Sequence, residues 1–270
     1  MKSEKKNSGG GFFLIVLLIA AVLVIGGRRW FPFSLADLLA DNYSSYTYPD
    51  AASYFVGGGR AKTEDVTSIE VSWLDGEVKV VRGKGDSIVW YDDTDSDAKD
   101  REKLHWRLRE DGTLELRPVA SDERRRHTKA LTVELPSGYI PDSLSIDGQK
   151  ASVVCDGLCA DRLTVSSGAA ITVSDTVAVN AWVASGNSPL TLGLTAGTLT
   201  ADNRSGSIEG RVTASVLTVK TTDGSITLEL GGGLAPSGTI SSDSGNILLT
   251  VPDADFLANV TVQGHAHIQS

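Results

Sequence analysis

The stretch LTVKTTDGSITLEL, residues 217–230, decides the fold. Aliphatic and polar residues alternate on both sides of a Thr-Asp-Gly corner, which is the period of two of a β-strand with one buried face. Gly224 lies at this corner, where we expect a positive φ that glycine adopts without steric cost. The stretch therefore predicts two short strands joined by a sharp turn.

The same unit recurs through the C-terminal half of the chain. Clear copies are LTADNRSGSIEGRV (199–212) and TISSDSGNILLTV (239–251), and fainter ones are LTVSSGAAITV (163–173), AWVASGNSPLTL (181–192) and LSIDGQKASVV (144–154). The corner glycines follow one another at intervals of 18 to 21 residues, and they are Gly148, Gly168, Gly186, Gly206, Gly224, Gly245 and Gly264. Because so short a unit cannot bury its own apolar face, neighbouring copies must stack. We expect Ile208, Ile226 and Ile247 to form one buried ladder.

Alternating runs also fill the part of the chain before the repeats, as in TSIEVSWL and KALTVELPSGY. Asp111-Gly112, between two such runs, is a strong β-hairpin signal. We expect this strand-rich part (66–140) to lead into the repeats (141–270) and to cap them. The predicted fold class is therefore all-β, a parallel β-helix or β-solenoid with a strand-rich N-terminal cap.

The composition agrees with such a fold. The chain has 270 residues, 28 of them glycine, and only 6% aromatic residues, which suits many tight turns around a thin aliphatic core. Its net charge of −9 argues against a nucleic-acid partner, whose phosphates it would repel. Two charged interruptions, 92–103 and 121–129, are most simply solvated loops, and the alternative for Arg124, Arg125 and Arg126 is an anion-binding patch.

Residues 12–27, FFLIVLLIAAVLVIGG, carry no charge. Counted from Gly9, the uncharged stretch approaches the roughly 20 residues that span a bilayer. The competing interpretation is a cleaved signal peptide, but no A-x-A-like site follows and Arg28 and Arg29 stand where cleavage would fall. We therefore expect one transmembrane helix preceding the solenoid, with a short basic cytoplasmic tail (1–11) before it.

Residues 28–65 read as a stalk, and the three glycines at 57–59 predict a flexible end to it. The charges on the two sides of the apolar segment lean only weakly toward an internal N-terminus. We expect a single-pass protein of the cell membrane whose ectodomain (66–270) is extracytoplasmic.

Several segments between roughly residues 50 and 270 share a characteristic order and spacing, namely IEVSWLDGEVKV (69–80), HWRLREDGTLELRP (105–118), LTVELPSGYIPDSLSID (131–147), the serial Ser-Gly corners and SSDSGNILLTVPDADFLANVTVQG (241–264). In this order and spacing they resemble the bacterial putative-adhesin family, a β-solenoid domain of unknown function on membrane anchors in Gram-positive bacteria. The resemblance implies a right-handed parallel β-helix, a location in the cell envelope and no established catalytic activity.

An enzyme is the main alternative, because parallel β-helices also host polysaccharide lyases and hydrolases. Such chemistry needs paired carboxylates or a Ca²⁺ cage on one stacked face. Aligning the repeats gives the outward rows Ser207/Ser225/Asn246, Glu209/Thr227/Leu248 and Arg211/Glu229/Thr250. These rows hold one oppositely charged pair, Arg211 with Glu229, and no carboxylate cluster, which favours a non-enzymatic protein without a cofactor.

Four aspartates recur just before the corners, namely Asp147, Asp202, Asp223 and Asp243. A stacked ladder of their oxygens would suit Ca²⁺, but side-chain capping of tight turns is the favoured interpretation because the G-G-x-G-x-D repeat is absent. His265 and His267 share one face of a predicted strand, and no further ligand accompanies them, so a surface pair is favoured over a metal site.

Cys155 and Cys159 flank an Asp-Gly-Leu tripeptide. The two can close a disulfide across a tight turn if their Cα atoms lie within about 7 Å. The other interpretation is two buried thiols in a reducing compartment. In an exported domain the structural disulfide is favoured.

Together these features predict a membrane-anchored, non-enzymatic protein of the cell envelope, either an adhesin or a scaffold in envelope-stress sensing. Its expected partners are the membrane and a cell-wall polymer or an envelope protein. The alternative is a carbohydrate-active β-helix enzyme.

Overall fold

The computed structural model describes residues 50–93, 100, 103–118, 130–232, 235–253 and 255–270, together with the backbone of 46–47 and 120–121. The predicted basic tail, the predicted transmembrane helix at 12–27 and the three arginines at 124–126 lie outside the described residues. Within the described ranges, no helix has the length and hydropathy that crossing a membrane requires.

The described chain is all-β apart from two 3-10 turns, η1 (Ala51–Ser53) and η2 (Thr63–Asp65). The strands before the repeats are β1 (Tyr46–Thr47), β2 (Phe55–Val56), β3 (Gly59–Lys62), β4 (Ser68–Ser72), β5 (Glu77–Arg82), β6 (Ser87–Asp92), β7 (Leu104–Leu108), β8 (Thr113–Pro118), β9 (Ala120–Ser121) and β10 (Ala130–Leu135). The remaining strands are β11 (Ser143–Asp147), β12 (Ser152–Asp156), β13 (Cys159–Ser167), β14 (Ile171–Ser185), β15 (Leu190–Asn203), β16 (Ile208–Thr221), β17 (Ile226–Leu230), β18 (Ser237–Thr250) and β19 (Asn259–Gln269).

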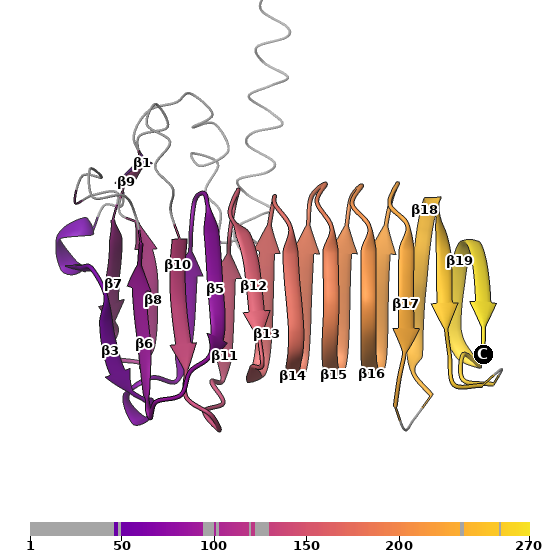
Figure 1. Cartoon of the computed structure of the whole chain (residues 1–270), viewed down its shortest axis with the longest axis horizontal. Helices are drawn as coiled ribbons and strands as arrows, with labels where there is room; N and C mark the ends of the chain where they lie inside the picture. Colours follow the sequence, from indigo (N-terminus) through magenta and orange to yellow (C-terminus); the bar gives the residue numbers. More distant parts are fainter. Residues whose placement is uncertain are drawn as a thin grey trace, which may run out of the picture. The chain divides into compact units, whose positions relative to one another are not determined.

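Parallel pairing stacks these strands on two faces (Figure 1). The first face runs β8, β4, β11, β13 and then the C-terminal part of β14 and of β15, followed by β16, β18 and β19. The second face runs β10, β5, β12 and then the N-terminal part of β14 and of β15, followed by β16, β17, β18 and β19. The predicted parallel β-solenoid is confirmed, while its right-handed sense stays a prediction.

The start of the stack is built differently. Antiparallel strands continue each face, β8–β7–β2 on the first and β10–β6–β3 on the second. The predicted hairpin at Asp111-Gly112 is the turn between β7 and β8. This end of the stack is therefore made of antiparallel strands, while the boundaries expected for the cap (66–140) and for the repeats (141–270) stay a prediction.

Aliphatic side chains form the core in register. The predicted ladder is confirmed, since Ile208 pairs with Ile226 and Ile226 with Ile247, and all three are at most 1% exposed. Toward the cap the same row continues through Leu190, Ile171, Val153 and Val78. Each turn thus buries its apolar residues against those of the neighbouring turns.

The end of the predicted stalk belongs to the sheet. Strands β2 and β3 lie within it, and two of the three glycines expected to give flexibility, Gly58 and Gly59, are close-packing positions instead, whereas Gly57 has a positive φ of 92° and no atom within 4 Å of a built Cβ. A Cβ built on Gly59 would lie 2.6 Å from the buried ring of Trp90, and one on Gly58 would lie 2.8 Å from the Trp90 carbonyl oxygen. These glycines let the cap strands approach Trp90.

The reason expected for the corner glycines is wrong at six of the seven positions. Only Gly264 has a positive φ, of 128°. At Gly224 and Gly245 the constraint is space, because a Cβ on either would overlap the carbonyl oxygen of the corner glycine one turn earlier. Gly206 is confined in the same way by Ser188, whereas a Cβ on Gly186 meets nothing within 4 Å. Stacked corners, rather than left-handed backbone, select glycine here.

A ladder of buried polar side chains lies inside these corners. Its members share one register row, are at most 8% exposed, and are Ser167, Ser185, Asn203, Thr221 and Ser242. The Ser242 hydroxyl donates to the Gly224 carbonyl at 2.9 Å and accepts from the Gly245 amide at 2.8 Å. The ladder therefore supplies the hydrogen bonds that buried corner backbone requires.

Candidate binding surfaces

The outward side of the first face presents a row of hydroxyl groups. Successive strands from β11 to β19 place in register Ser145, Thr164, Trp182, Thr200, Thr218, Thr239 and Thr261. Neighbouring members are one strand spacing apart, about 4.8 Å. The row is therefore a regular line of hydroxyls that one indole interrupts.

Trp182 is the aromatic residue of this row. Its side chain is 41% exposed, whereas Trp73 and Trp90 are buried in the core. Thr164 and Thr200 flank it on the two adjoining strands. The indole therefore lies on a polar surface without a covering element among the described residues.

The second face carries the rows that the repeats predicted. Glu209 pairs with Thr227 and Arg211 with Glu229, and the Arg211–Glu229 ion pair measures 3.4 Å between exposed groups. An exposed pair of this kind contributes little to stability. The charged members that these register pairs bring side by side are Arg211 and Glu229.

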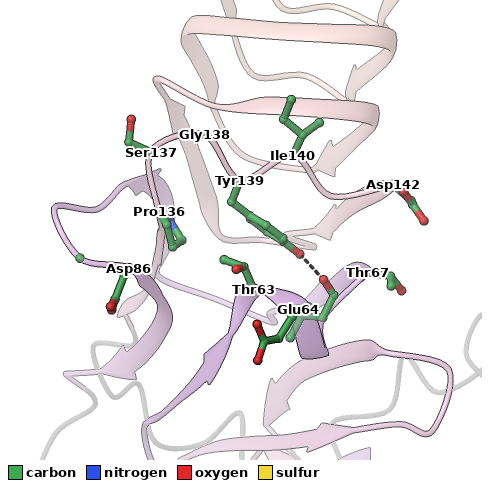
Figure 2. Close-up of a pocket in the computed structure, with 12 residues that line it drawn as sticks. Thr63, Glu64, Thr67, Asp86, Pro136, Ser137, Gly138, Tyr139, Ile140 and Asp142 are labelled. Atoms are coloured by element: carbon green, nitrogen blue, oxygen red, sulfur yellow. Dashed lines mark hydrogen bonds between the residues drawn. The ribbon is translucent and has the colours of Figure 1, made fainter.

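A pocket of about 750 Å³ lies in the strand-rich part, and the repeat analysis gave no signal for it. It opens between η2, the loop before β6 and the segment after β10 (Figure 2). Tyr139 lines it and donates a hydrogen bond of 2.8 Å to the Val66 carbonyl. Burial, and then the nearby Asp142 carboxylate, raise the pKa of Tyr139 to about 12, so the phenol stays protonated.

Three carboxylates line this pocket, those of Glu64, Asp86 and Asp142. Figure 2 shows them on different sides of the opening and not converging on one point. Glu64 is engaged by Lys62 at 3.2 Å. General acid–base chemistry on a glycoside uses two carboxyl groups that face one bond.

Within the residues that the structure describes, several charged side chains of β7 and β8 cluster around Glu115. The buried carboxylate of Glu115 accepts from the Tyr54 hydroxyl at 2.6 Å and from Arg107 Nε at 2.8 Å, and Arg117 lies 2.9 Å away. Burial acts to raise the pKa of Glu115, but the Tyr54 hydrogen bond and the two guanidinium groups outweigh it and lower the pKa. Asp50 also pairs with Arg107 at 2.7 Å. The cluster fastens the chain at residues 50–54 onto β7 and β8.

The two cysteines are separate thiols in this structure. Cys155 points into the core between Val80 and Val173, and burial raises the pKa of its thiol to about 12. Cys159 is half-buried and pairs in register with the exposed Val177. The two thiols thus differ in burial, and the predicted disulfide stays a prediction.

Turn capping by the pre-corner aspartates is confirmed at Asp147, whereas other residues cap the corners that contain Asp202, Asp223 and Asp243. Asp147 accepts from the Gln149 amide at 3.3 Å, as turn capping predicts. At the later corners the capping groups are Asn203, Thr221 and Ser242, which accept hydrogen bonds from the amides of Gly206, Gly224 and Gly245.

His265 and His267 are exposed on β19, and no group of three metal-ligating side chains occurs among the described residues.

Sequence reasoning missed Trp182, although extending the repeat alignment by one copy, 181–192, would have placed it in the Thr200–Thr218 row. The Tyr139 pocket had no comparable signal, because its walls come from three separate loops.

The described part of the chain is thus a parallel β-solenoid with an antiparallel cap. A solved putative adhesin from Bacteroides fragilis NCTC 9343 is similar, with 11% identity over 79% of this chain and 95% of that chain and a TM-score of 0.48. A putative adhesin from Parabacteroides merdae ATCC 43184 has 13% identity over 79% of this chain and 95% of that chain, with a TM-score of 0.40. A putative cell adhesion protein from Clostridium sporogenes ATCC 15579 has 7% identity over 78% of this chain and 100% of that chain, with a TM-score of 0.34. No family model matches the chain, and no curated protein matches it.

Proposed function

We propose that this chain is a non-enzymatic binding module of the cell envelope. The observation that carries the proposal is the first face, where Thr164, Thr200 and Thr218 represent a row of outward hydroxyls repeated strand after strand. Hydroxyl groups both donate and accept hydrogen bonds. A regular array of them suits a ligand that itself repeats, such as a cell-wall polymer or an envelope protein with repeated polar groups.

The carbohydrate-active enzyme is the weaker candidate. The described pocket holds three carboxylates that diverge, and the most buried carboxylate, Glu115, is already engaged by Tyr54 and Arg107. A catalytic carboxyl must reach its substrate within hydrogen-bond distance. This geometry supports binding without turnover.

The location is part of the proposal. The uncharged segment 12–27, followed by Arg28 and Arg29, supports an uncleaved anchor with the solenoid outside the cytoplasm. The net charge of −9 supports partners other than nucleic acid.

A sedimentation assay tests the proposal. Full-length protein in mild detergent is mixed with washed envelopes, and the bound fraction is measured together with any release of reducing or unsaturated sugar ends. We expect saturable binding with no sugar ends released. Release above that from heat-inactivated protein, or the absence of binding, overturns the proposal.

A further inference from the structure

We propose that Trp182 and the polar side chains around it on the first face form a binding site for an extended, uncharged polysaccharide. The inference rests on the proposed function, because it names the ligand class of the same face. It begins from the one large apolar side chain in a row of hydroxyls.

The position does not require tryptophan for folding. Its register partners Thr164 and Thr200 occupy the equivalent place on adjoining strands, so a small polar residue fits the fold. The Trp182 ring instead stands in water at 41% exposure. A sugar ring offers an apolar C–H face of similar breadth, and an exposed aromatic ring gives that face a packing surface.

The polar side chains around Trp182 can hydrogen-bond with the hydroxyl groups at the edge of a sugar ring. Thr164 and Thr200 lie one strand spacing, about 4.8 Å, to either side of Trp182. Their hydroxyls donate and accept, as sugar hydroxyls do. Asn180 precedes Trp182 by two residues on the same outward side and adds an amide with both capacities.

The charges around the indole favour an uncharged ligand. Arg162 lies on the strand before Trp182 and Asp202 on the strand after it, at the two diagonal positions of the sheet. One is cationic and the other anionic, and both are exposed. A charged polymer would be attracted electrostatically to one of these two side chains and repelled by the other. A neutral sugar can form hydrogen bonds with both.

The row of hydroxyls also sets the direction in which a bound polysaccharide would run. Thr218, Thr239 and Thr261 continue it beyond Thr200 at one hydroxyl per strand. An extended polysaccharide along the row meets a hydroxyl at each strand, so its affinity should rise with its length.

A protein partner is less well matched to this site. Val177 and Val179 are also exposed on β14. The alternation of buried and exposed residues breaks at Val179–Asn180, where two consecutive side chains are exposed and the strand turns a corner. The valines therefore do not share the outward side of Trp182, and the indole lacks the apolar surroundings of a protein-binding hot spot.

The test uses full-length protein in mild detergent and soluble β-1,4-linked oligomers of glucose and of N-acetylglucosamine of increasing length. Binding is measured by calorimetry and by protection of tryptophan fluorescence from acrylamide. We expect affinity to grow with oligomer length and the Trp182→Ala variant to lose about tenfold or more. Trp182→Tyr should retain most of the binding. The matched control is Val177→Ala, an apolar side chain on the same strand that is 50% exposed but does not share the outward side of Trp182, and it should leave affinity within about twofold.

Each outcome decides a separate point. Unchanged affinity in Trp182→Ala overturns the site while leaving the envelope-binding proposal standing. The same holds if wild-type protein binds envelopes but none of the oligomers, or if protease treatment of the envelopes abolishes binding through Trp182, which would make the partner a protein. Absence of any binding to envelopes removes the proposed function itself.

Discussion

The backbone amide of Gly224 donates a hydrogen bond of 3.1 Å to the side-chain oxygen of Thr221, and both residues are buried in the corner between β16 and β17. The same Thr221 oxygen lies 3.5 Å from the carbonyl of Gly206, one turn earlier. One hydroxyl therefore satisfies the backbone of two successive corners.

Thr221→Val tests this link. The substitution keeps the shape of the side chain and removes its hydroxyl, so the Gly224 amide and the Gly206 carbonyl lose a buried partner. We expect the free energy of unfolding to fall by about 1–3 kcal/mol, measured by chemical denaturation. Thr218→Val on the same strand is the control, and because Thr218 faces outward its change should stay within about 0.5 kcal/mol. Equal effects would contradict a role for the corner hydroxyl.

Gly224→Ala tests whether space selects the corner glycines. The new Cβ would overlap the Gly206 carbonyl oxygen, so the corners must move apart. We expect a loss of about 1–3 kcal/mol, the range of overpacking in a close-packed interior. Gly186→Ala, whose Cβ meets nothing within 4 Å, is the matched control and should be nearly neutral. A large loss at Gly186 together with none at Gly224 would contradict the stacking explanation.

The Glu115 cluster predicts a pH dependence of stability. Folding lowers the pKa of this carboxyl, so its contribution is fully present above the unfolded pKa of roughly 4.3 and is lost as the pH falls through the folded pKa. Glu115→Gln should lower stability at neutral pH and flatten the acid-side slope of the unfolding free energy. An unchanged slope between about pH 6 and 3 would show that the cluster does not couple to folding.

Asp147 predicts the opposite sign. Burial raises the pKa of this carboxyl, and the Gln149 amide and the Ser166 hydroxyl offset that only in part. Its protonated form favours the fold, so stability declines as the pH rises through the folded pKa. We expect Asp147→Asn to unfold at higher denaturant concentration than wild type at pH 7, and at an equal or lower one at about pH 3. Destabilisation at pH 7 would contradict the prediction.

Thiol labelling joins the cysteine geometry to topology. With the two thiols separate, an impermeant maleimide on intact cells should label Cys159, and Cys155 should react only after unfolding because it is buried. Cys159→Ser should abolish the native label. Labelling only after a reductant would establish the disulfide, and labelling only after lysis would place the domain in the cytoplasm.

The parts of the fold that were predictable are those that repeat. The period of two and the spacing of the corners identified the stacking of Ile208, Ile226 and Ile247 and the Arg211–Glu229 pair, because register follows directly from a repeat. The reason for glycine at the corners was not predictable. The sequence does not distinguish a glycine that is needed for a positive φ from one that is needed because a neighbouring carbonyl leaves no room for a Cβ.

The candidate sites were less accessible to sequence reasoning. The Tyr139 pocket depends on loops that meet only through the β10–β5 and β10–β6 pairings. The Glu115 cluster joins Tyr54 to Arg117 over long sequence separation, and alternation alone predicts Glu115 to face water. Trp182 stands on a faint copy of the repeat, in the irregular unit before Gly186.

The register has a consequence for how such a chain changes length. Residues 208–225 begin at Ile208 and end just before Ile226, and both isoleucines follow a Gly-Ser pair. Removing this segment would join Ser207 to Ile226 and bring β15 against β17. Each row of stacked side chains would continue in the same register. The protein would shorten by one strand spacing, about 4.8 Å, and keep its cap and its last turn. Gene duplication or loss of whole turns can therefore adjust the reach of this molecule in fixed steps.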